Sequence, residues 1–163
     1  MNRARAQSWL FAATLILAIV LQLMPLPAVI APLKPYWLAL VLIYWGIEVP
    51  ERATLGFALL LGLASDVLTG QLLGEQAMRL VMLTFIVLRF RARLRFFPMW
   101  QQTLAVMALL TNDRIVVAMI DGFAGRPTPP AQFWLAPAVG AAIWPFLFVL
   151  LDDLRARLRA RDA

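Results

Sequence analysis

The sequence contains no cysteine and no histidine among its 163 residues. It therefore cannot form a structural disulfide, and it lacks the thiolate and imidazole ligands of most zinc and haem sites. Nucleophiles and bases that depend on cysteine or histidine are absent for the same reason. Six aspartates and three glutamates remain as acidic groups, and they form no recognisable catalytic pattern. We expect no cofactor, no metal site and no enzymatic activity.

Charged residues are also scarce. They make up 15% of the chain, against 63% hydrophobic residues and a mean hydropathy of +0.80. A soluble domain has about 45–50% apolar and about 25% charged residues. This composition excludes an ordinary soluble domain and predicts an all-α integral membrane protein. Because one spanning helix takes about 20 residues, six would take about 120 and leave about 43 of the 163 residues for tails and connections. Residues 1–163 are expected to form a single transmembrane domain.

Prolines, glycines and charged residues divide the chain into six predicted spans. Residues Pro25, Pro27, Pro32 and Pro35 form a connection that no helix can cross. A second connection, residues 125–130, reads Gly-Arg-Pro-Thr-Pro-Pro. The predicted spans cover residues 9–24, 36–48, 53–68, 75–88, 99–123 and 132–151.

The distribution of basic residues predicts the orientation of these spans. With the N-terminus inside, eleven arginines fall on the cytoplasmic side, and only Lys34 and Arg126 fall outside. Arg79 and Arg114 lie within spans. Because cytoplasmic loops are rich in arginine and lysine, we expect both termini in the cytoplasm.

Four of these cytoplasmic arginines alternate with apolar residues between residues 88 and 96. In an extended conformation their guanidinium groups would share one face. We interpret the run as topogenic charge that contacts anionic lipid headgroups, in preference to a nucleic-acid site. The expected headgroup contacts are Arg89, Arg91, Arg93 and Arg95.

Six charged residues are predicted to gather in the outer half of the membrane, where an ionisable group is costly. They are Asp66, Glu75, Arg79, Asp113, Arg114 and Asp121. One interpretation is local pairing, with Glu75 next to Arg79 at i,i+4 and Arg114 reaching the outer interface along its own stem. The other is a shared polar cavity or a partner-docking site. We predict that at least one carboxylate of another segment lies within salt-bridge distance of Arg79 or Arg114. Asp66 and Glu75 are the candidate partners for Arg114.

Several short motifs occur in an order that resembles the MreD family of the bacterial rod-shape machinery. They are Leu21-Gln22-Leu23-Met24-Pro25, Lys34-Pro35-Tyr36-Trp37, Tyr44-Trp45, Pro50, Gly56, Gly62, Asp66, Gly70, Leu73-Gly74, Trp100-Gln101-Gln102 and Trp144-Pro145. The resemblance covers nearly the whole chain. We expect the following residues to serve helix packing and turns: Pro35, Trp37, Gly62, Gly70, Gly74, Trp144 and Pro145. The sequence Asn112-Asp113-Arg114 is more polar than we expect in the fifth helix of that family.

This resemblance implies a scaffold of the elongation machinery in the bacterial inner (cytoplasmic) membrane, and this scaffold binds the bitopic protein MreC. It implies a complex with MreB filaments, a SEDS glycan polymerase and a class B penicillin-binding protein. It also implies a fold like the S-components of energy-coupling-factor transporters. The alternative function is therefore a small-solute-binding subunit of such a transporter, which would use the outer polar residues.

Overall fold

A computed structural model describes the backbone of residues 3–161 and the side chains of residues 5–160. Within that range the chain forms six α-helices, two short 3-10 helices and no strand, so the all-α prediction is confirmed. The elements are α1 (Arg3–Leu23), η1 (Ala31–Leu33), α2 (Trp37–Glu48), α3 (Leu55–Thr69), α4 (Glu75–Phe96), α5 (Met99–Phe123), η2 (Ala131–Leu135) and α6 (Ala136–Arg161).

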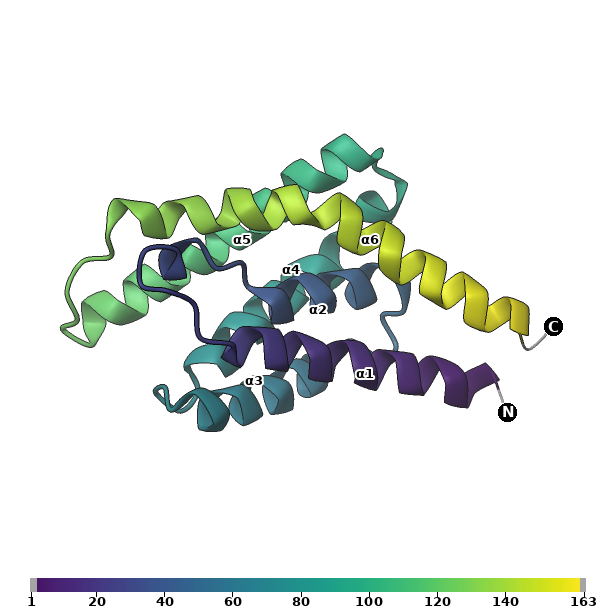
Figure 1. Cartoon of the computed structure of the whole chain (residues 1–163), viewed down its shortest axis with the longest axis horizontal. Helices are drawn as coiled ribbons and strands as arrows, with labels where there is room; N and C mark the ends of the chain where they lie inside the picture. Colours follow the sequence, from purple (N-terminus) through teal and green to yellow (C-terminus); the bar gives the residue numbers. More distant parts are fainter. Residues whose placement is uncertain (1–2, 162–163) are drawn as a thin grey trace.

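Successive helices run in alternating directions along one elongated bundle (Figure 1). The start of α1 and the end of α6 therefore lie at the same end, together with the α2–α3 and α4–α5 connections. We call this the terminal end. The opposite end, which we call the distal end, carries η1, the α3–α4 turn and the connection that leads to η2.

Helix α2 forms the core of the bundle. Every residue from Leu38 to Ile47 is buried, and α1, α4, α5 and α6 all contact this helix. A helix that is apolar on every side is expected to be buried in this way. Its 12 residues rise only about 18 Å, well short of the roughly 30 Å of a bilayer's hydrocarbon core.

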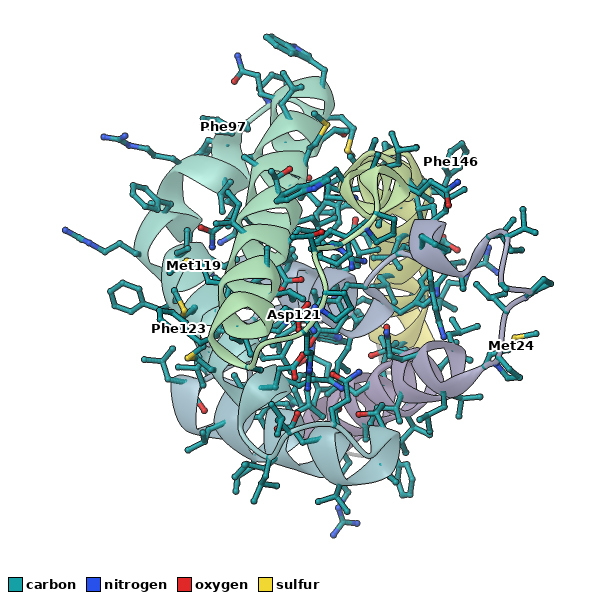
Figure 2. The ribbon with its side chains drawn as sticks, turned by 90° about the vertical axis from the view of Figure 1, so that its left-hand side faces the viewer. Met24, Phe97, Met119, Asp121, Phe123 and Phe146 are labelled. Atoms are coloured by element: carbon teal, nitrogen blue, oxygen red, sulfur yellow. The ribbon has the colours of Figure 1, made fainter. Side chains whose placement is uncertain are left out.

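The outer surface of the bundle is largely apolar. Seen from the distal end, Met24, Phe97, Phe123 and Phe146 project away from the centre (Figure 2). Among the described residues, three helical stretches could cross a membrane by length and composition: Arg5–Leu23, Met99–Phe123 and Ala131–Ala160. These findings support a membrane protein. The six individual spans stay predictions.

Helix α4 differs from its expected form. It continues to Phe96 instead of ending near residue 88, because no glycine or proline interrupts it before Pro98. The prediction that the arginines between residues 88 and 96 lie on an extended strand is therefore wrong. Residues two apart on a helix are about 200° apart, so successive arginines point to opposite sides. Arg91 is half-buried and donates from Nε to the Ile47 carbonyl at 2.8 Å, while Arg89, Arg93 and Arg95 are exposed.

Candidate functional site

The site begins at the α3–α4 turn, which Asp66 closes. Its buried carboxylate accepts the backbone N–H of Gly74 and that of Gln76, each at 2.8 Å. The first N–H groups of a helix have no partner within the helix, and a carboxylate there is favourable with the helix dipole. The position of Asp66 thus agrees with a capping role and not with a free charge.

Glycines make this turn possible. A Cβ on Gly62 would lie 2.2 Å from Ala77 Cα, so only glycine allows α3 to pack this closely on α4. Gly62 is one helical turn before Asp66, on the same face. Gly70 and Gly74 have φ values of +65° and +97°, a conformation that other residues rarely adopt.

Arg79 pairs with Asp113 across the α4–α5 interface. Nε donates to Oδ1 at 2.8 Å and one terminal nitrogen donates to Oδ2 at 2.6 Å, which is the bidentate geometry of strong arginine–carboxylate pairs. The guanidinium carbon also lies 4.4 Å from the centre of the Tyr36 ring. The predicted cross-helix carboxylate is confirmed. Asp66 and Glu75, the candidates expected to meet Arg114, do not supply it, because the face of α5 that carries Asp113 packs directly against Arg79.

Glu75 pairs not with Arg79 but with Arg126, at 3.2 Å, so the expected i,i+4 pair is also wrong. The same Arg126 nitrogen lies 2.8 Å from Asp121. Asp121 points toward the middle of the distal end (Figure 2). The hydrogen bond that Arg126 donates to Asp121 and the nearby charge of Glu75 raise the pKa of Arg126 above its ordinary value. One loop arginine therefore joins the first turn of α4 to the last turns of α5.

Arg114 has no carboxylate partner among the described residues. It donates to the Lys34 carbonyl at 3.4 Å and lies 4.4 Å from the centre of the Phe133 ring. This agrees with an arginine that extends toward the distal connections. Lys34 in turn donates to the Gln22 and Met24 carbonyls at the end of α1. Its partial burial lowers the pKa of its amino group.

Neutral groups connect these charges. The Tyr36 hydroxyl donates to Gln76 Oε1 at 3.3 Å, and Gln76 Nε2 donates to Thr69 Oγ1 at 2.9 Å. We define the distal polar cluster as the six predicted residues together with Lys34 and Arg126. It holds four acidic and four basic side chains. The cluster thus resembles an internal cross-link between helices more than an open charged site.

A second polar group, which the sequence did not lead us to expect, lies at the terminal end. Arg155 donates to Glu48 Oε2 at 2.8 Å and to the Tyr44 hydroxyl at 3.4 Å. With Arg91 on the Ile47 carbonyl, two arginines meet the C-terminus of α2, where positive charge is favourable. The helical spacing of Trp144, Leu151 and Arg155 on the buried face of α6 could have revealed this.

The remaining predicted packing residues lie at helix starts and interfaces. Trp144 is fully buried and donates to Gln102 Oε1 at 3.1 Å, and Gln102 Nε2 donates to the Leu94 carbonyl at 3.1 Å. Pro145 lies inside α6. The Pro35 carbonyl accepts the N–H of Trp37, where α2 begins. The contacts of Gln102 with Trp144 and Leu94 join α4, α5 and α6 near the terminal end.

Comparison with known proteins assigns the chain to a family. Residues 3–154 match the family described as rod shape-determining protein MreD. The chain belongs to the MreD family. It is 30% identical over 144 residues to the rod shape-determining protein MreD of Haemophilus influenzae, which covers 88% of this chain and 89% of that protein. MreD is a membrane protein family that determines rod shape, so this chain is placed in rod-shape determination at a membrane.

No solved structure matches the chain. The expected likeness of this MreD-family fold to transporter S-components is therefore not shown. The role of the distal polar cluster in partner docking also stays a prediction.

Proposed function

We propose that this MreD-family protein is a non-catalytic scaffold of the cell-elongation machinery in the inner membrane. It binds MreC directly. Through MreC it helps to couple MreB filaments to the SEDS glycan polymerase and the class B penicillin-binding protein. Both termini face the cytoplasm.

The internal pairing of the distal polar cluster is the observation that carries this proposal. Arg79 is satisfied by Asp113, and Glu75 and Asp121 share Arg126. Such pairs hold α4, α5 and the distal connections in one arrangement, and they leave these paired charges unavailable to a solute. A bundle whose helices are linked by ion pairs and whose outer surface is apolar suits the positioning of other membrane proteins.

The solute-binding alternative draws less support from the same contacts. A small polar solute would have to replace ion pairs of 2.6–3.2 Å that the protein already makes. Breaking one of them would leave a buried charge unpaired, which is costly. We therefore favour the scaffold.

The direct test is co-purification. The full-length tagged chain is expressed with MreC in a rod-shaped bacterium, extracted in mild detergent and isolated. We expect MreC to be recovered in a constant ratio, with the two synthases and MreB present in smaller amounts. A tagged inner-membrane protein of similar size and unrelated family is the control. Recovery of MreC no greater than with that control would reject the proposed function.

A further inference from the structure

An apolar groove of about 380 Å³ runs between α4 and α5. Its α5 wall consists of Ala105, Ala108, Leu109 and Asn112, which are spaced i, i+3, i+4 and i+7 and thus share one helix face. Ile86 and Phe90 contribute to the α4 wall. The groove therefore follows each helix for about two turns.

Asn112 is the unexplained polar residue of this groove. Its two neighbours are accounted for, since Asp113 binds Arg79 and Arg114 contacts Lys34 and Phe133. The Asn112 amide lines the groove and makes no hydrogen bond to any of the described residues. It lies thirteen residues after Met99, about 20 Å along α5, and thus at membrane depth if α5 spans. An amide without a partner in an apolar medium is unfavourable.

We propose that this groove is the docking site of one transmembrane helix from a partner protein, and that this helix carries a hydrogen-bonding side chain opposite Asn112. The small side chains of Ala105 and Ala108 allow the backbone of the partner helix to approach that of α5 closely. Polar side chains such as Asn112 can then form a hydrogen bond between the two helices. Arg93 lies at the end of the groove nearer the α4–α5 turn, so an acidic group of the partner helix fits there. This inference rests on the proposed function, in which the partner is the bitopic protein MreC.

A lipid fits the same groove less well. An acyl chain would fill the apolar part and a phosphate would suit Arg93, but a hydrocarbon tail offers no hydrogen bond to the Asn112 amide. A helix with a serine, threonine, asparagine or glutamine at that depth satisfies the amide as well as the apolar walls.

The first test replaces Asn112 in the full chain expressed with full-length MreC. We expect Asn112→Leu to retain about three- to tenfold less MreC than wild type, as loss of one interhelical hydrogen bond predicts. The purified variant alone should unfold at the same temperature or higher, because it loses an unpaired amide. The matched control is Thr111→Val, since the Thr111 hydroxyl bonds only the Met107 carbonyl of its own helix. Unchanged retention by Asn112→Leu would overturn the inference.

The second test uses the absence of cysteine, which makes any introduced thiol unique. Ala108→Cys places a thiol in the groove. Met107→Cys places one at the same depth, about 100° around α5, on an exposed position outside the groove. Each variant is labelled with a thiol-specific photo-crosslinker in membranes that contain MreC. We expect an MreC adduct from position 108 and at least fivefold less from position 107.

The alternatives give different products. Adducts with lipid only, or with a second copy of the chain, would overturn the partner-helix site. If wild type retains MreC but position 107 gives the adduct, this inference fails while the proposed function stands. If wild type retains no MreC, the proposed function itself fails.

Discussion

The ion pair between Arg79 and Asp113 illustrates how charges survive inside an apolar bundle. The Asp113 side chain is 2% exposed and that of Arg79 is 10% exposed. Removing one partner of such a pair costs about 3–5 kcal/mol because the other charge stays buried, whereas apolar replacement of both is often neutral. An exposed pair such as Arg157–Asp153 contributes only about 0–1 kcal/mol.

We therefore predict that Asp113→Leu lowers the free energy of unfolding by about 3 kcal/mol or more. The double variant Arg79→Met/Asp113→Leu should recover most of that loss, since no unpaired charge remains. Asp153→Asn is the control and should stay close to wild type. Thermal unfolding in detergent, followed by tryptophan fluorescence, compares the stability of these three variants with that of wild type. A double variant as unstable as Asp113→Leu would argue against the pair as the cause.

Asp66 permits a second prediction about a single residue. Asp66→Ala leaves the N–H groups of Gly74 and Gln76 without their acceptor and should cost about 1–2 kcal/mol, the usual range for a lost helix cap. In cells that depend on this chain, rod shape should suffer more from Asp66→Ala than from Asp162→Ala, whose site lies outside the described residues. Cell width and protein level are measured together. Near-normal width and level in both variants would exclude a special role for Asp66.

At the scale of secondary structure, the α3–α4 hairpin depends on contact between two backbones. At Gly62 an added methyl group would meet the Ala77 backbone, which cannot move without separating the helices. At Gly56, in the same helix, nothing lies within 4 Å of the added atom. One helix thus contains a glycine that packing requires and a glycine that it does not.

Gly62→Ala is accordingly expected to destabilise the protein by about 1–3 kcal/mol, the typical cost of overpacking. Gly56→Ala should be neutral or stabilise by up to about 1 kcal/mol through helix propensity. Both variants are compared by unfolding temperature and by the amount of protein extracted from membranes. If the two behave alike, the close approach of α3 and α4 at Gly62 does not limit stability.

At the scale of the whole molecule, charge and helix direction agree. Arginines of the α2–α3 connection, the end of α4 and the end of α6 all lie toward the terminal end (Figure 1). Lys34 and Arg126 are the basic residues of the distal connections. This asymmetry favours a terminal end in the cytoplasm.

Reporter fusions test that orientation. We predict that a reporter placed after Arg95, or at the chain end after Ala163, which lies outside the described residues, reports the cytoplasm. A reporter at Thr128 should report the outside. The physical reason is the bias of arginine toward cytoplasmic loops. A C-terminus outside the cytoplasm would require an odd number of crossings and would contradict the alternating arrangement of six helices.

The sequence by itself determined the helical class and most helix positions. Helix α5 runs from Met99 to Phe123, the predicted range, because apolar length and the proline before it are local properties. The glycines of the α3–α4 turn were also identifiable in advance, since a tight turn favours that residue type. The gathering of charged residues in the distal half followed from counting residues along helices of alternating direction.

Only the tertiary structure decided which groups meet. Asp113 lies 34 positions from Arg79, and Glu48 lies 107 positions from Arg155. These pairs depend on which faces of separate helices pack together, and helical periodicity in one segment does not specify the partner face in another. The burial of α2 on every side has the same origin, because a short apolar helix can contact lipid or protein. Its apolar residues permit either environment, and its four neighbouring helices place it in the protein core.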